Sequence, residues 1–205
     1  MKTEIVLASG SPRRKELLRQ VGLSFEICPA KGEEVMKGEN PEEIVKELAT
    51  QKAFEVYRRY VEEGCIEKEK KVFIGADTVV AYEGKILGKP MDEADAYEMI
   101  EMLQGKKHQV HTGVCVIVAG EKKEAVIESF ASTTQVEVYP MSKADILDYI
   151  ETKEPMDKAG AYGIQGYFAQ YIKGIEGDYA NVVGLPVGRL CKLLRDLKIV
   201  VHEVK

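Results

Sequence analysis

An apolar run that is interrupted by a single carboxylate constrains this chain more than any other feature. It lies in residues 73–90, which read FIGADTVVAYEGKILGKP. The run stops at Gly75-Ala76, Asp77 and Thr78 follow, and Val79-Val80 resume it. Burying an unpaired carboxylate costs several kcal/mol, so we expect Asp77 to lie where a strand meets a cleft holding a cation, a water or a substrate. A structural ion pair is the alternative interpretation.

The same stretch predicts a hairpin. Glu83-Gly84 favours a tight two-residue turn, and the chain would return through residues 85–88 to Lys89. The hairpin could bring Lys89 back near Asp77. An acid at a strand end with a lysine on the returning strand suits the handling of a phosphorylated substrate.

Composition excludes several classes of partner. The 205 residues are 45% hydrophobic and 31% charged, which is ordinary for a soluble globular protein. The net charge of -5 argues against a general nucleic-acid surface. No apolar run approaches the ~20 residues of a membrane span, and the N-terminus lacks a signal-peptide pattern, so we expect a cytoplasmic protein. The spacing of His108 and His111 does not suit a zinc site.

An anion site is expected near the N-terminus. Residues 4–8 read as a buried strand, Ser9-Gly10-Ser11 as a loop, and Ser11 with Pro12 as a helix start. Free backbone N–H groups at such a helix start, together with Arg13 and Arg14, favour an anion. A surface arginine pair is the alternative, but the first turn disfavours cations unless an anion offsets them.

The remaining pattern predicts an α/β unit, with a bilobed arrangement left open. Further helices are expected over residues 41–63, after Asp92, over 142–151 and from Pro186, and a long hairpin over 110–139 that turns at Gly120-Glu121. The first of these helices would bury Ile44, Leu48, Phe54 and Val61. Lys52 lies on it among apolar neighbours, so its ammonium could point into a cleft or toward solvent.

Two glycine-rich stretches, 157–166 (DKAGAYGIQG) and 174–186 (GIEGDYANVVGLP), carry polar residues that alternate with aliphatic and aromatic ones. Glycines this dense let the backbone approach another group closely. Polar side chains such as Gln165 and Asn181 supply specific hydrogen bonds. A flexible surface loop is the alternative, but such loops are richer in Ser, Lys and Glu.

Six segments in this order resemble the Maf family of nucleoside triphosphate pyrophosphatases, which are also described as septum-formation inhibitors. The matching segments are SGSPRR at 9–14, GADTVV at 75–80, Lys89-Pro90, Gly105 with His108 and 112–114, 157–166, and 177–186. The resemblance covers nearly the whole chain. It implies a single bilobed domain over residues 1–205: an α/β fold like that of inosine triphosphate pyrophosphatases, with an elongated, mixed, twisted sheet flanked by helices and a central cleft.

The resemblance also assigns residues. It implies Asp77 as the proton acceptor, Arg13, Thr78 and Gln165 as specificity positions, and a metal site at Glu34 and Asp77. The phosphate-handling positions would be Ser9, Arg13, Arg14, Lys52 and Lys89. Whether Asp77 acts as base, as metal ligand or as both stays open. A carboxylate is a weak base at neutral pH, so either a metal ion acidifies the attacking water or burial makes the carboxylate more basic.

The implied reaction is hydrolysis of dTTP and UTP, with modified pyrimidine nucleotides as further candidates, to the monophosphate and pyrophosphate. A divalent cation, Mg²⁺ or Mn²⁺, would bridge phosphate oxygens and carboxylates. Two other functions stay open: a non-catalytic nucleotide- or partner-binding regulator of septation, and a pyrophosphatase for damaged purine nucleotides. The expected partner is the nucleoside triphosphate, without nucleic acid or membrane, and a homodimer is left open.

Overall fold

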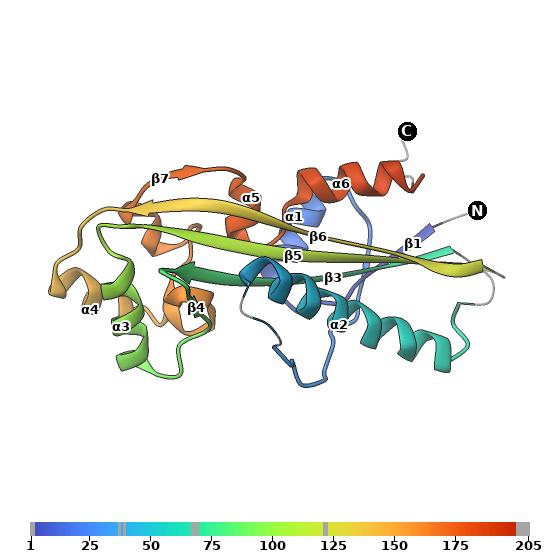
Figure 1. Ribbon diagram of the computed structural model, residues 1–205, viewed down its shortest axis with the longest axis horizontal. Helices are drawn as coiled ribbons and strands as arrows, with labels where there is room; N and C mark the ends of the chain where they lie inside the picture. Colours follow the sequence, from blue (N-terminus) through green and yellow to red (C-terminus); the bar gives the residue numbers. More distant parts are fainter. Residues whose placement is uncertain (1–2, 37, 39, 67–69, 121–122, 200–205) are drawn as a thin grey trace. The chain divides into compact units, whose positions relative to one another are not determined.

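A computed structural model describes residues 3–36, 38, 40–66, 70–120 and 123–199 (Figure 1). Strands and helices alternate along the chain in nearly the order that the sequence predicts. The strands are β1 (Thr3–Leu7), β2 (Glu26–Ile27), β3 (Lys70–Tyr82), β4 (Lys85–Leu87), β5 (Lys107–Gly120), β6 (Lys123–Val138) and β7 (Ile172–Glu176). The α-helices are α1 (Pro12–Gln20), α2 (Pro41–Glu62), α3 (Glu93–Leu103), α4 (Lys143–Glu151), α5 (Tyr179–Val183) and α6 (Val187–Asp196).

Three short 3₁₀ helices complete this list: η1 (Glu154–Asp157), η2 (Ala159–Ala161) and η3 (Tyr167–Tyr171). Within the described residues the strands form one seven-stranded sheet in the order β2-β1-β3-β5-β6-β7, with β4 added beside β3. The sheet is mixed, because β1 pairs in parallel with both β2 and β3, whereas β3–β4 and β6–β7 are antiparallel. The expected α/β class, a mixed sheet flanked by helices, is therefore confirmed. Of the predicted turn Gly120-Glu121, Glu121 lies outside the described residues.

The chain divides into two compact units, and neither is continuous in sequence. The first unit comprises Met1–Asp77, Thr112–Ala131 and Gly184–Lys205, and the second comprises Thr78–His111 and Ser132–Val183. Strands β3, β5 and β6 supply residues to both. None of the described helices is long and apolar enough to cross a membrane.

In the first unit, helix α2 packs closely on the sheet. Asn40 caps the helix by accepting a hydrogen bond from the N–H of Glu42, as its sequence predicts. A Cβ on Gly75 would lie 2.2 Å from the carbonyl oxygen of Ala49, and one on Gly113 would lie 2.0 Å from that of Val45. Glycine at these two strand positions therefore lets the helix backbone approach the sheet. The predicted burial of Val61 is wrong, because it lies in the last turn of α2 and is exposed.

In the second unit, α3 and α4 cover an apolar core together with the 3₁₀ segments. Its fully buried members include Ile100, Leu103, Tyr149 and Phe168. The α4 helix begins with a capping box in which Ser142 and Asp145 bond each other's backbone N–H groups. The aromatic rings of Tyr162 and Phe168 lie 4.8 Å apart in this core.

Two local predictions have different outcomes. The Glu83-Gly84 hairpin is confirmed: both residues have positive φ, 47° and 77°, and Tyr82 pairs with Lys85. The pairing stops at Val80 and Leu87, so Lys89 lies beyond the ladder. Ser11 does precede α1, but its side chain makes no capping hydrogen bond.

Candidate active site

Asp77 is an ion-paired carboxylate on β3. It is the last residue of this strand that belongs to the first unit. It is buried, and its Oδ1 lies 2.5 Å from the Nζ of Lys52 on α2. The same Nζ lies 2.9 Å from Oε1 of Glu34. The ammonium of Lys52 is thus paired with two carboxylates. The sequence does not decide whether Lys52 points into a cleft or toward solvent. In the structure its ammonium points toward Asp77.

Glu34 is held near Lys52 because its loop is tied to the neighbouring residues of α2. Glu55 accepts hydrogen bonds from the N–H groups of Lys31 and Gly32, at 2.8 and 2.9 Å. Gln51 donates to the carbonyl of Val35 at 2.9 Å and accepts from its N–H at 3.2 Å. These ties lie on both sides of Glu34 in the sequence, although its side chain is half exposed.

The predicted anion loop also belongs to the first unit. Ser9 is buried, and its Oγ accepts a hydrogen bond from Arg14 at 3.1 Å. Arg14 Nε donates to the carbonyl of Gly184 at 2.8 Å. Burial lowers the pKa of Arg14, while the nearby carboxylates of Asp77 and Glu34 oppose that shift and Arg13 adds to it. The guanidinium keeps its charge in any case, so Arg14 adds a second positive charge, besides Lys52, near the carboxylates of Asp77 and Glu34.

The donor set fits a divalent cation. Two carboxylates converge on the position that the Lys52 ammonium takes, within 2.5 and 2.9 Å of one nitrogen. Hard oxygen donors suit Mg²⁺ and Mn²⁺, and Mg²⁺ is commonly held by one or two carboxylates together with substrate phosphates. The described residues contain no cluster of three or more metal-binding side chains, so the remaining ligands would have to come from substrate and water.

The structure places Thr78, Lys89 and Gln165 in the second unit. Thr78 follows Asp77 on β3, so the two side chains point to opposite faces of the strand. Lys89 and Gln165 are exposed, and within the described chain neither side chain makes a hydrogen bond or ion pair. Both are therefore available to a ligand.

The backbone before Gln165 adopts an unusual conformation. Gly160 has φ of 68°, and a Cβ there would lie 2.8 Å from the side chain of Val80. Ala161 also has positive φ, 58°, which is uncommon for a residue with a side chain. The N–H of Gly160 donates to the carbonyl of Gly88 at 2.9 Å and ties this segment to the chain after β4. The predicted close backbone approach is thus present at Gly160.

His108 has a partner that its sequence position does not suggest. Its Nε2 lies 2.7 Å from the hydroxyl of Tyr162, and the two rings meet edge to face. Burial lowers the pKa of His108 to about 4, so the ring is neutral at pH 7. His111 lies 2.9 Å from Thr133 Oγ1 through its Nδ1.

Other polar residues of the glycine-rich stretches form internal contacts. Asn181 is fully buried and donates to the carbonyl of Val110 and to Thr134 Oγ1, both at 3.0 Å. Thr134 in turn donates to the carbonyl of Asp178 at 3.0 Å. These groups anchor α5 to strands β5 and β6, so the polar residues named here make internal structural contacts.

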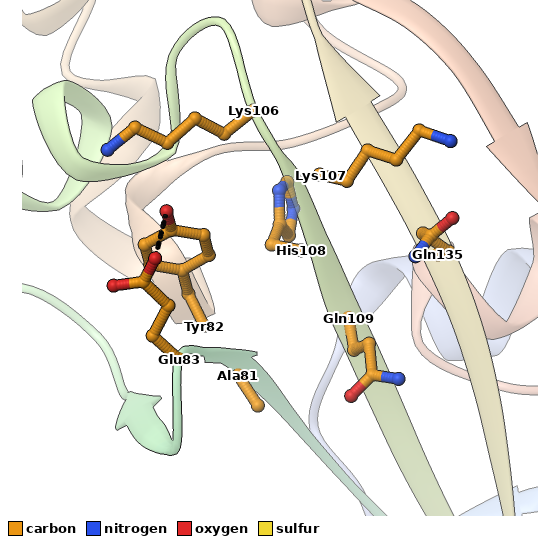
Figure 2. A pocket seen from close by; sticks show the side chains of 8 residues that line it. All are labelled: Ala81, Tyr82, Glu83, Lys106, Lys107, His108, Gln109 and Gln135. Carbon is orange, nitrogen blue, oxygen red and sulfur yellow. Dashed lines mark hydrogen bonds between the residues drawn. The ribbon is translucent and has the colours of Figure 1, made fainter.

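The second unit also has a pocket that the sequence did not indicate (Figure 2). Its volume is about 410 Å³. It is lined by Ala81, Tyr82, Glu83, Lys106, Lys107, His108, Gln109 and Gln135. The ammonium of Lys106 lies 5.1 Å from the ring centroid of Tyr82, whose hydroxyl donates to Glu83 at 2.8 Å. The predicted site positions lie elsewhere in the chain.

Comparisons with known proteins agree on one family. Residues 4–197 match the family model described as Maf-like protein. A dTTP/UTP pyrophosphatase of Agathobacter rectalis is 51% identical over 200 residues, which cover 95% of this chain and 98% of that one. The dTTP/UTP pyrophosphatase of Lachnoclostridium phytofermentans is 46% identical over 91% of each chain, and that of Carboxydothermus hydrogenoformans is 48% identical over 94% of this chain and 98% of its own.

A solved structure of lower identity also aligns with the chain. A HAM1 protein from Coxiella burnetii aligns over 95% of this chain and 100% of its own, at 13% identity and a TM-score of 0.46.

Proposed function

Because the chain belongs to the Maf family, we propose that it is a nucleoside triphosphate pyrophosphatase that hydrolyses dTTP and UTP. Relatives at 46–51% identity that span nearly the whole chain bear this activity as their name. The observation that carries the proposal is the shared ion pair at Lys52. This ion pair brings the isolated carboxylate of the GADT segment together with a second carboxylate, near the guanidinium of Arg14.

The first unit supplies groups for the phosphate chemistry. Lys52 and Arg13 would offset the negative charge of the polyphosphate, as electrostatic stabilisation of phosphoryl transfer requires. We assign Arg14, Ser9 and the start of α1 to the same anion. Asp77 is the proposed proton acceptor, and in the structure its carboxylate is paired with Lys52. Binding of a triphosphate would draw the Lys52 ammonium toward phosphate and free the carboxylate oxygens.

Glu34 and Asp77 are the proposed holders of a divalent cation. When bound, such a cation neutralises phosphate charge and acidifies a coordinated water. Both carboxylates already contact a single cationic group, so replacing part of that positive charge by a metal fits the electrostatics of the site. The cytoplasm, where nucleoside triphosphates are found, is the compartment that we propose.

The second unit supplies groups for choosing the base. Gln165 offers an amide that both donates and accepts, which matches the N3–H and O4 edge of uracil or thymine. Cytosine reverses that pattern at N3 and N4. A site built for one edge leaves polar groups unpaired with the other, at a cost of about 1–3 kcal/mol per group. We assign Thr78 and Arg13 to specificity with Gln165, and Lys89 to the phosphates.

A panel of nucleoside triphosphates tests the proposal. With Mg²⁺ or Mn²⁺ present, kcat/KM for UTP and dTTP should exceed that for CTP, ATP and GTP. Gln165→Ala should lower kcat/KM for UTP by about tenfold and change the value for CTP less. The matched control is Gln170→Ala, at an exposed glutamine five residues later in η3, and it should keep the parent ranking. Hydrolysis of damaged purine nucleotides ahead of UTP, or binding without turnover, would contradict the assignment.

A further inference from the structure

Gln165 lies in a tight turn whose backbone fixes where its side chain points. The N–H of Gly166 donates to the carbonyl of Gly163 at 3.3 Å, so the turn encloses Ile164 and Gln165. The exposed Gln165 side chain has no hydrogen-bond partner in the described chain. Its direction therefore depends on whatever holds the two ends of the turn.

Glu154 holds both ends. Its Oε2 accepts a hydrogen bond from the N–H of Tyr167, directly after the turn, at 2.8 Å. Its Oε1 accepts from the hydroxyl of Tyr149 at 3.0 Å, and that hydroxyl accepts from the N–H of Gly163 at 3.3 Å. One carboxylate is thus linked to the residue after the turn directly and to the start of the turn through one tyrosine.

The glycine at the end of the turn is explained by the same carboxylate. Gly166 has φ of -104°, which any residue can adopt. A Cβ there would, however, lie 2.1 Å from Glu154 Oε2. A side chain at this position would therefore displace the Glu154 carboxylate, and glycine leaves room for it.

Glu154 is itself fixed in place. Its carbonyl accepts a hydrogen bond from Lys158 Nζ at 2.6 Å, and its N–H donates to Thr152 Oγ1 at 3.2 Å. Burial, and then the negative charge of Glu154, raises the pKa of Tyr149. The tyrosine consequently stays protonated at neutral pH and keeps donating to the carboxylate.

We propose that Glu154 is a positioning residue for base selection, which orients Gln165 by holding the turn from Gly163 to Gly166. The inference rests on the proposed function, because it takes Gln165 as the group that reads the base. Glu154 acts through the turn and, unlike Gln165, needs no contact with the nucleotide. The preference for one nucleotide over another therefore depends on the carboxylate of Glu154, the first residue of η1.

The test compares Glu154→Ala, Glu154→Gln and the control Glu151→Gln, which removes an exposed carboxylate three residues earlier in α4. Glu154→Ala should lower the ratio of kcat/KM for UTP to that for CTP by about tenfold. Glu154→Gln should lower it less, because the amide oxygen can still accept one of the two hydrogen bonds. Glu151→Gln should keep the parent ratio. Exchange of the Tyr167 amide proton, measured by NMR without nucleotide, should be faster in Glu154→Ala.

A double variant separates positioning from general damage. If Glu154 acts through Gln165, Glu154→Ala with Gln165→Ala should have the same UTP to CTP ratio as Gln165→Ala alone. A parent-like ratio in Glu154→Ala, or an equal loss for both nucleotides, would overturn the inference alone. A parent enzyme without pyrimidine preference, or a Gln165→Ala variant with the parent ranking, would overturn the proposed function and this inference with it.

Discussion

One lysine shared by two carboxylates is the central feature at the residue scale. The Lys52 ammonium lies within hydrogen-bonding distance of both Asp77 and Glu34, and the side chains of Lys52 and Asp77 are largely buried. Partial burial makes such a pair more sensitive to loss of one member than a surface ion pair. The surroundings of Asp77 are therefore compatible with a structural ion pair and with a catalytic base, and only turnover distinguishes the two.

Asp77→Asn is the variant that makes this distinction. It keeps the shape of the side chain and removes the proton acceptor, so kcat should fall by at least about 100-fold. Affinity for nucleotide without metal should change little, as measured by calorimetry. Asp196→Asn, at an exposed ion pair on α6, is the control and should keep parent activity. A near-normal kcat in Asp77→Asn would leave the structural ion pair as the better interpretation.

Some residues could be interpreted from sequence and others could not, for a physical reason. Asp77 stood out because a carboxylate inside an apolar run is a local anomaly. The sequence alone does not determine the direction of the Lys52 side chain, because it depends on Asp77, which lies 25 residues away in the chain. The roles of Glu154 and of the tyrosine partner of His108 have no local sequence signal, because Glu154 contacts Tyr167 13 residues later and His108 contacts Tyr162 54 residues later.

At the scale of elements, helices with caps and the tight hairpin were predictable because their signals lie within a few residues. Pro41 after Asn40, and Glu83-Gly84 between two strands, are examples that the structure confirms. Strand β7 was not predicted. Its sequence IKGIE is short and contains a glycine, so its strand character comes from pairing with β6, which a local pattern does not show.

The buried His108 on β5, which is hydrogen-bonded to Tyr162, should make the stability of the fold depend on pH. The folded pKa is about 4 and lies below the ordinary value of 6.5. The unfolded chain therefore takes up the proton first as pH falls, and stability is lost between these two values. The contribution of His108 to the free energy of unfolding should fall by about 2 kcal/mol between about pH 7.5 and about pH 5.

Urea unfolding across this pH range measures the effect. His108→Gln can still hydrogen-bond Tyr162 but does not titrate, so its stability should fall less than that of the parent over the same interval. Equal losses in both proteins would show that other groups carry the acid sensitivity.

At the scale of the whole molecule, each compact unit is built from stretches that are separated in the sequence. The first unit combines residues 1–77 with 112–131 and 184–205, and the second unit combines residues 78–111 with 132–183. Three of the four crossings from one unit to the other fall inside the continuous strands β3, β5 and β6, and the fourth directly follows α5, so the strand pattern of the sequence does not mark them. The family match over residues 4–197 could be anticipated from six short motifs, whereas the division into units could not.

The most direct test of the proposed function identifies the products of UTP hydrolysis by phosphorus NMR. The parent enzyme with Mg²⁺ should release UMP and pyrophosphate, and Asp77→Asn should release little of either in the same time. Pyrophosphate is expected because hydrolysis between the α and β phosphates leaves the β and γ phosphates joined. Release of UDP and orthophosphate, or no turnover by the parent with any triphosphate, would contradict the account.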